Sequence, residues 1–337
     1  MKRLIIIIIS ICLLVGFVVG FTFSTVNEKV AIADDTRIYI PDGTDYAALL
    51  DTLDARQCLK SHGAFNRIAK LRGLPGHIKP GSYVVRPGSR VFSLVQKLYS
   101  GNQDPLRITI NRHRTVGDLC QFLGSKLAFD ADSLLALLQQ DEFCARYGCT
   151  PQTVIGLFLQ NTYEFYWTVS PAKFVERMAA ESEQFWQSRD SRLADLCLTR
   201  QQVLALASIV EEETNCNEEK PDIASVYLNR LRIGMALQAD PTVKFALGDF
   251  SVRRIKGSML AIDSPYNTYR NAGLPPGPIC LPSAASIDAV LQNKSTGYLY
   301  FCAKEDFSGR HNFAANAEQH AANARKFHNA LNQRNIH

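Results

Sequence analysis

Residues 207–214 read Ala207-Ser208-Ile209-Val210-Glu211-Glu212-Glu213-Thr214, an apolar run that ends in three consecutive carboxylates. Upstream, Thr199 and Gln202 form the Thr-x-x-Gln pattern that is typical of a helix N-terminus. Large apolar side chains then recur at helical spacing, at Val203, Leu204, Leu206, Ile209 and Val210. This spacing predicts a helix with one buried face.

The three glutamates occupy different positions around that helix. Glu213 lies roughly 50° from the direction of the apolar side chains, Glu211 roughly 110° and Glu212 roughly 150°. We therefore expect Glu212 to be solvated, Glu211 to be intermediate and Glu213 to continue the apolar stripe. A carboxyl group on an apolar face is either paired or has its pKa raised, and a raised pKa suits a general acid. A solvated helix end also tolerates such a triplet, so local chemistry leaves both interpretations open.

The chain beyond the triplet carries further blocks in a fixed order. They are Val226-Tyr227-Leu228-Asn229-Arg230-Leu231, Arg232-Ile233-Gly234-Met235, Leu237-Gln238, Asp240-Pro241-Thr242-Val243, Tyr266-Asn267-Thr268-Tyr269, Gly273-Leu274-Pro275-Pro276-Gly277-Pro278-Ile279 and Tyr298-Leu299-Tyr300-Phe301. With the triplet, they resemble the core of the endolytic murein transglycosylases, the peptidoglycan-cleaving family called YceG-like. In that family the catalytic acid is the Glu immediately before the Thr. The resemblance thus implies Glu213, the residue that the helical wheel also singles out.

The resemblance also suggests where substrate binds. Tyr266, Asn267 and Tyr269 lie in a long loop from Ser264 to Pro282, and loops of this length are usually functional or disordered. Aromatic rings cover the apolar faces of sugars and amides bond to hydroxyl and N-acetyl groups, although plain turn chemistry would use the same residues. The expected substrate-binding set is Ser208, Gln238, Asp240, Tyr266, Asn267 and Tyr269.

Two other family blocks give weaker indications. His311-Asn312-Phe313 matches a short block at the end of the catalytic region, and we hold His311 as a supporting residue of the site, although a lone His beside a turn is more often structural. Gln160-Asn161 stands where the family usually carries Pro-Asp, so no acidic role is expected at Asn161.

The N-terminus predicts a membrane anchor. Leu4 to Phe23 is uncharged and long enough to cross a bilayer as a helix, whereas the apolar region of a signal peptide is shorter. Lys2 and Arg3 precede the span, which predicts a cytoplasmic N-terminus at residues 1–3 and a periplasmic body on the inner membrane.

Composition excludes several classes of function. The net charge of +5 is small and comes without a basic-aromatic stripe, which argues against nucleic acid as a partner. The sequence has no HExxH, paired-Cys zinc spacing, P-loop or GxGxxG pattern, so we expect neither a metal nor a cofactor. With Cys12 in the anchor, eight cysteines remain outside. The sequence is compatible both with disulfides and with buried free thiols.

The expected fold class is α+β: the anchor at 4–23, a small LysM-like α/β module at 36–104 and a mixed α/β catalytic domain at 105–337. In the module, strands are expected at 36–40 and 82–85, with helices from near Asp45, at 63–71 and after a Pro87-Gly88-Ser89 cap. Gly81-Ser82-Tyr83 is similar to the LysM-like part of the family, a glycan-binding type of module, and a mere spacer is the alternative. In the catalytic domain we expect strands at 106–110 and 298–303 and helices at 116–127, 132–140, 171–187 and 314–331. We also expect a helix with Pro221 in its first turn, which packs as a hairpin on the helix that ends in the three glutamates. A turn is expected at 238–242, and a further helix is expected to be capped by Ser283.

The resemblance implies cleavage of the β-1,4 bond between N-acetylmuramic acid and N-acetylglucosamine in nascent peptidoglycan. Only one carboxylate is firmly indicated, which favours a lytic transglycosylase that closes a 1,6-anhydro ring within strands and ends their elongation. The expected partners are glycan strands, the inner membrane and cell-wall synthases. Two alternatives are a membrane-tethered peptidoglycan-binding scaffold without catalysis and a hydrolysing muramidase with Glu211 or Asp240 as the second carboxylate.

Overall fold

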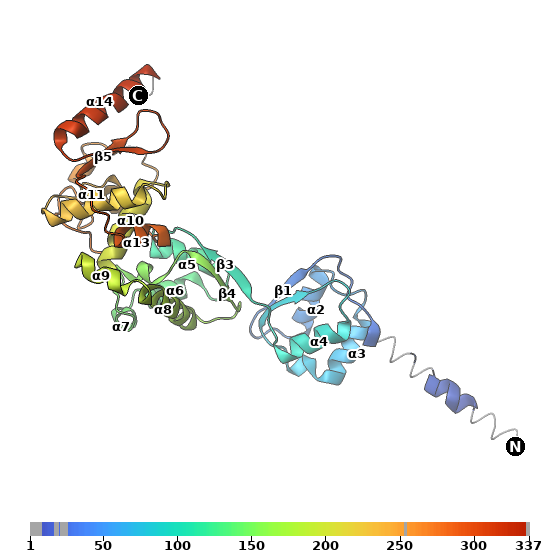
Figure 1. Ribbon diagram of the computed structural model, residues 1–337. Coiled ribbons are helices and arrows are strands. Elements are labelled where there is room, and N and C mark those ends of the chain that lie inside the picture. Colours follow the sequence, from blue (N-terminus) through green and yellow to red (C-terminus); the bar gives the residue numbers. More distant parts are fainter. Residues whose placement is uncertain (1–8, 17–19, 21–25, 253–254, 335–337) are drawn as a thin grey trace. The chain divides into compact units, whose positions relative to one another are not determined.

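The computed structural model describes residues 9–16, 20, 26–252 and 255–334 of the chain. They divide into two compact units, which are considered separately (Figure 1). The first unit contains the residues up to Ile108 with 126–128 and 163–169, and the second contains 109–125, 129–162 and the residues from Ser170 onward.

The predicted anchor falls largely outside the described residues. Residues 9–16 are helical and exposed, and most of the remaining positions between 4 and 23 are not described. In the described part of the chain, no single helix has the length and apolar composition of a membrane span. One pair of helices, Asp190–Leu196 and Arg200–Glu213, meets these criteria jointly but is bent by 83°.

The first unit is built on an antiparallel pair of strands, β1 (Thr36–Ile40) and β2 (Gly81–Val85). Its other elements are α2 (Tyr46–Ala55), α3 (His62–Arg72), η1 (Leu74–Gly76) and α4 (Val91–Ser100). These match the expected strands and helices closely. The helix α4 follows Arg90 without a side-chain cap, so the predicted cap at Pro87-Gly88-Ser89 is wrong. The strands and helices enclose a core of their own that includes Ile40, Leu53 and Tyr83. Glycan binding by this unit stays a prediction.

A second two-stranded sheet joins β3 (Leu106–Ile110) to β4 (Asn161–Phe165), and its residues are divided between the two units. The helical elements that follow β3 are α5 (Val116–Gly124), α6 (Ala131–Leu138), α7 (Asp141–Ala145), η2 (Val154–Leu157), α8 (Pro171–Gln187), α9 (Asp190–Leu196), α10 (Arg200–Glu213), α11 (Lys220–Arg232), α12 (Asp240–Leu247), η3 (Met259–Ala261), α13 (Ala284–Leu291) and α14 (Ala317–Gln333). An antiparallel hairpin, β5 (Tyr300–Ala303) with β6 (His311–Ala314), lies between α13 and α14.

The helix α10 is the centre of the second unit (Figure 1). Its N-terminus has a full capping box, in which Thr199 and Gln202 each accept a hydrogen bond from the other's backbone N–H. Every residue from Val203 to Val210 is buried, because α11 and α13 both pack against α10. The expected helical hairpin of α10 and α11 is confirmed. This packing holds the carboxyl end of α10, with the three glutamates, in a defined place.

Two features of the second unit differ from expectation. Asp240 begins α12 rather than a turn, because Pro241 in the first turn provides a favourable start for a helix. The strand β6 pairs with β5 and places His311 on a strand. The segment between α12 and α13 was expected as a loop from Ser264 to Pro282 and contains neither helix nor strand there. It is followed by α13, whose N-terminus is capped by the Ser283 side chain as expected.

All nine cysteines lie in the described residues, and all are free thiols. The closest pair in sequence, Cys144 and Cys149, is linked by a hydrogen bond from the Cys149 thiol to the Cys144 carbonyl rather than by a disulfide. Of the two interpretations left open by the sequence, the structure corresponds to free thiols.

Candidate active site

A pocket of about 440 Å³ opens at the carboxyl end of α10. It receives side chains from α10, α11, α12, β5, α14 and the loop before α13, so elements distant in sequence meet there. The lining residues are Glu213, Tyr227, Arg230, Leu237, Gln238, Asp240, Tyr269, Tyr300, Phe301 and His320.

Glu213 is the carboxylic acid of this pocket with the strongest perturbation. The Tyr227 hydroxyl donates a hydrogen bond of 2.6 Å to Glu213 Oε1. The pKa of Glu213 is raised from 4.5 to about 7, chiefly because burial disfavours the carboxylate. The Tyr227 hydrogen bond acts in the opposite direction, and the negative charge of Asp240 adds to the rise. At neutral pH, Glu213 can therefore both give and accept a proton.

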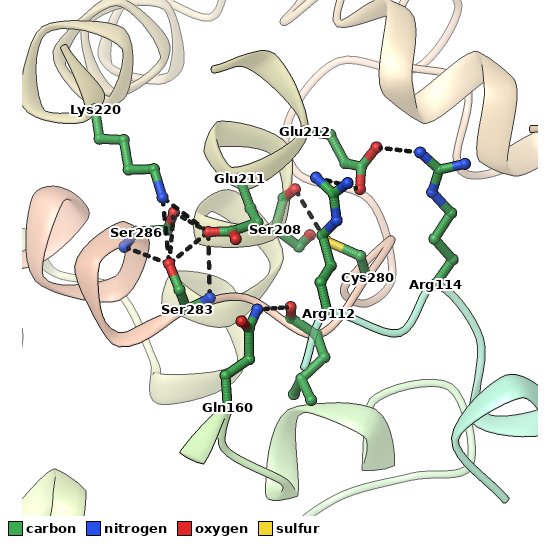
Figure 2. A network of polar contacts seen from close by, with 11 residues as sticks. Arg112, Arg114, Gln160, Ser208, Glu211, Glu212, Lys220, Cys280, Ser283 and Ser286 are labelled. Carbon is green, nitrogen blue, oxygen red and sulfur yellow. Dashed lines mark hydrogen bonds and ion pairs between the residues drawn. The ribbon is translucent and has the colours of Figure 1, made fainter. Parts of the chain in front are cut away.

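The electrostatics of the helix end explain why the proton belongs on Glu213. A helix C-terminus carries partial negative charge, so three carboxylates in the last turn repel both the helix end and one another. Glu211 is neutralised by Lys220, whose Nζ lies 3.0 Å from Glu211 Oε2, and by hydrogen bonds from the Ser283 and Ser286 hydroxyls (Figure 2). Burial opposes ionisation of Glu211, but these partners outweigh it and lower its pKa.

Glu212 is neutralised from another side. Its carboxylate lies 3.4 Å from the guanidinium of Arg112 and 3.1 Å from that of Arg114, and only 13% of its side chain is exposed (Figure 2). Arg114 also lies over the ring of Phe250, 4.6 Å from its centre. The expectation of a solvated Glu212 is wrong, because the segment after β3 supplies two cations that the helical wheel could not include. Among the residues that the structure describes, Glu213 is the carboxyl group of the triplet that has no ion pair.

Asp240 and Tyr269 also line the pocket. The Tyr269 hydroxyl donates a hydrogen bond of 2.6 Å to Asp240 Oδ1. The loop reaches α12 through Thr268, whose hydroxyl accepts a hydrogen bond from the Ala239 N–H and lies 2.8 Å from the Thr242 hydroxyl. Gln238, just before α12, has a left-handed φ of 50°, a strained conformation that is common at functional sites. Three of the six expected substrate-binding residues, Gln238, Asp240 and Tyr269, therefore share the pocket with Glu213.

The other three expected substrate-binding residues lie outside the pocket lining and have structural contacts. The buried Ser208 hydroxyl donates to the Ala205 carbonyl and accepts from the Ile279 N–H, which fixes the proline-rich loop to α10. Asn267 is fully buried, and its amide donates to two backbone carbonyls of the preceding segment. The ring of Tyr266 packs against Phe245. The polar atoms of Ser208 and Asn267 are hydrogen-bonded within the protein, and substrate contact by these two residues stays a prediction.

Several pocket residues were not assigned to the site from sequence. Tyr227 lies in one of the quoted motif blocks, and its hydroxyl proves to be the partner of Glu213. Arg230 is buried, donates to the carbonyls of Leu237 and Leu299, and lies 5.3 Å from the centre of the Tyr300 ring. The spacing of three residues between Tyr227 and Arg230 on one helix was the available signal. No such signal linked His320, which comes from the distant helix α14.

His311 lies beside the pocket rather than in its lining. Its Nδ1 is 3.2 Å from Glu219 Oε2, and its ring packs edge-on against Phe301, which does line the pocket. A supporting role for His311 stays a prediction. Within the described parts of the chain, no group of three or more His, Cys, Asp or Glu residues is placed to hold a metal ion.

A larger cavity, of about 580 Å³, lies at the opposite end of α10. Its lining includes Trp186 and Arg200, and its only carboxylate, Glu183, forms an ion pair with Arg200. A carboxylate held by a cation is unsuited to proton transfer at neutral pH. The chemistry therefore points to the smaller pocket beside Glu213.

Comparisons with known proteins place the chain in a family. A sequence profile of the YceG-like family matches residues 38–326. A Bacillus subtilis (strain 168) protein named endolytic murein transglycosylase is 29% identical over 313 residues, which cover 88% of this chain and 86% of that protein. Proteins of the same name from Streptococcus pneumoniae strains D39 and R6 are 26% identical, over 84% of this chain and 57% of their own length. The crystal structure of a YceG-like protein from Listeria monocytogenes aligns with a TM-score of 0.60 and 27% identity, over 86% of this chain and 99% of that chain.

Proposed function

The chain belongs to the YceG-like family, and we propose that it is an endolytic murein transglycosylase, a lyase that acts on peptidoglycan, with Glu213 as its catalytic acid. The observation that carries the assignment is the Glu213 carboxyl group in the pocket at the end of α10, with a pKa near 7 and a hydrogen bond from Tyr227. A scaffold without catalysis would have no need of an acid whose pKa is raised in this way.

The bond cleaved is the β-1,4 linkage between N-acetylmuramic acid and N-acetylglucosamine. Protonated Glu213 gives its proton to the glycosidic oxygen, and the N-acetylglucosamine side leaves as an alcohol. The hydrogen bond from Tyr227 stabilises the carboxylate that this step creates. The same carboxylate then takes the proton of the muramoyl 6-hydroxyl as its oxygen closes on the anomeric carbon. The product is a 1,6-anhydro ring, Glu213 ends protonated again and no water is consumed.

Asp240 supports the reaction through its charge. Its carboxylate faces the same pocket and is held by Tyr269, so it favours the positive charge that develops at the anomeric carbon in the transition state. The position of Asp240 in the pocket is also compatible with one alternative, a hydrolysing muramidase in which Asp240 activates water. Glu211 is less suited to that role, because Lys220, Ser283 and Ser286 already occupy its carboxylate.

The cellular setting belongs to the proposal. The uncharged span Leu4–Phe23, preceded by Lys2 and Arg3, supports an inner-membrane anchor with the catalytic body in the periplasm. The LysM-like module at 36–104 would hold nascent glycan strands near the membrane, where cell-wall synthases produce them. Cleavage there within strands ends their elongation.

Replacement of the acid tests the assignment. We expect Glu213→Gln to retain the fold and to lose between about 10²- and 10⁴-fold in turnover of purified glycan strands, the usual contribution of a proton-transfer group. Glu218→Gln is the matched control, because Glu218 lies on the loop after α10 with 74% of its side chain exposed. Similar turnover by both variants would exclude Glu213 as the acid.

A further inference from the structure

His320 is the residue that α14 contributes to the catalytic pocket. Its imidazole stacks on the Tyr300 ring, with the ring centres 5.2 Å apart and an angle of 22° between the planes. Tyr300 in turn lies against the guanidinium of Arg230. These stacked side chains form one wall of the pocket that also contains Glu213.

Several polar side chains of the pocket are already hydrogen-bonded within the protein. Tyr227 donates to Glu213, Tyr269 donates to Asp240, and Arg230 donates to backbone carbonyls. Among the described residues, nothing pairs with the buried Nδ1 of His320. Buried polar atoms without a partner are rare and cost free energy, so such an atom in a binding pocket indicates a partner that arrives with the ligand.

The charge state of His320 limits what that ligand can be. Burial lowers the pKa of the imidazole, and the positive charge of Arg230 lowers it further. The ring is therefore neutral at neutral pH, with one nitrogen as donor and the other as acceptor. A neutral donor and acceptor suits the hydroxyl and acetamido groups of a sugar, whereas a carboxylate or phosphate would be better served by a cation.

We propose that His320 contacts the substrate directly, its imidazole forming a hydrogen bond with a hydroxyl or acetamido group of the sugar that lies beside Glu213. The ring is held by stacking rather than by hydrogen bonds, so it can rotate about its Cβ–Cγ bond and present Nδ1 as the sugar enters. Its role is binding, because Glu213 already supplies and recovers the proton. This inference rests on the proposed function.

Substitution at His320 tests its proposed role in substrate binding, because loss of a binding contact changes KM more than kcat. His320→Phe keeps a ring on Tyr300 but removes both nitrogens. We expect KM for purified uncrosslinked glycan strands to rise by about 2- to 10-fold, the worth of one neutral hydrogen bond, with kcat little changed. The control is His328→Phe, an exposed position two turns further along α14, which should leave both constants unchanged. A large fall in kcat at unchanged KM would contradict a binding role.

A spectroscopic measurement tests whether His320 contacts the sugar, and it does not depend on whether His320→Phe folds. The Glu213→Gln protein, labelled with ¹⁵N-histidine, is titrated with a purified GlcNAc-MurNAc tetrasaccharide. We expect the His320 ring nitrogens to shift on binding while those of His328 stay in place. Binding of the tetrasaccharide without a shift at His320 would overturn this inference and leave the proposed function intact. The absence of any binding would count against the proposed function itself, and against this inference with it.

Discussion

At the scale of single residues, the structure explains how three identical side chains acquire different chemistry. Glu211 forms an ion pair with Lys220, and Glu212 forms one with Arg114 in the segment after β3. Glu213 instead accepts a hydrogen bond from the neutral hydroxyl of Tyr227. The helical wheel singled out Glu213 from sequence, because the direction of a side chain depends only on local geometry. It could not predict the partners, which come from elements 9 to almost 100 residues away.

The raised pKa of Glu213 predicts a dependence of stability on pH. The folded protein holds this proton up to about pH 7, whereas the unfolded chain releases it near 4.5. The contribution of Glu213 to the free energy of unfolding is therefore fully present below pH 4.5 and is lost as the pH rises to 7. We expect Glu213→Gln to gain stability relative to the parent over that interval, as measured by urea unfolding at pH 4.5 and pH 8. A difference in stability that is the same at both values would contradict the raised pKa.

Glu212 gives a second prediction at this scale. The sequence predicted a solvated Glu212, but Glu212→Gln leaves Arg112 and Arg114 without their shared carboxylate. We expect a loss of about 1–3 kcal/mol in the free energy of unfolding. Since the negative charge of Glu212 helps to raise the pKa of Glu213, the alkaline limb of the pH–rate profile should also move to lower pH. An unchanged profile together with parental stability would show that Glu212 is merely a surface residue.

At the scale of elements, local signals predicted much of the fold. The capping box at Thr199 and Gln202, Pro221 in the first turn of α11 and Ser283 before α13 were all readable in sequence, because helix ends are set by nearby side chains. Which residues line the pocket was harder to predict from the sequence. The hairpin of β5 and β6, and the approach of α14 to Tyr300, depend on contacts between distant segments.

Ser208 is a motif residue that supports the site indirectly, by holding a loop against a helix. Its hydroxyl accepts the Ile279 N–H and so fixes the loop before α13 to α10. We expect Ser208→Ala to lose about 1–3 kcal/mol in the free energy of unfolding, because the buried N–H is left without a partner, with KM of the folded enzyme unchanged. Ser125→Ala, at an exposed serine, is the control in thermal unfolding and glycan turnover. A raised KM at parental stability would instead support Ser208 as a substrate-binding residue.

At the scale of the whole molecule, the chain combines a small α/β unit with the larger unit that carries the pocket. The proposed anchor at Leu4–Phe23 would keep both on the periplasmic side of the inner membrane. Protease added to intact spheroplasts should then digest the chain beyond the anchor, while a cytoplasmic marker protein survives. Protection of the full-length chain until the membrane is dissolved would place the body in the cytoplasm and contradict the anchor's orientation.

The type of glycan cleavage can be read from the products of one digest. Uncrosslinked glycan strands are incubated with residues 25–337 in ¹⁸O-labelled water, and the early products are weighed by mass spectrometry. We expect fragments of mixed length that end in 1,6-anhydro-muramoyl groups and carry no ¹⁸O. Reducing ends that contain ¹⁸O would mean hydrolysis, with Asp240 as the group that activates water, and early release of disaccharides alone would mean cleavage from strand ends. Either result would contradict an endolytic transglycosylase.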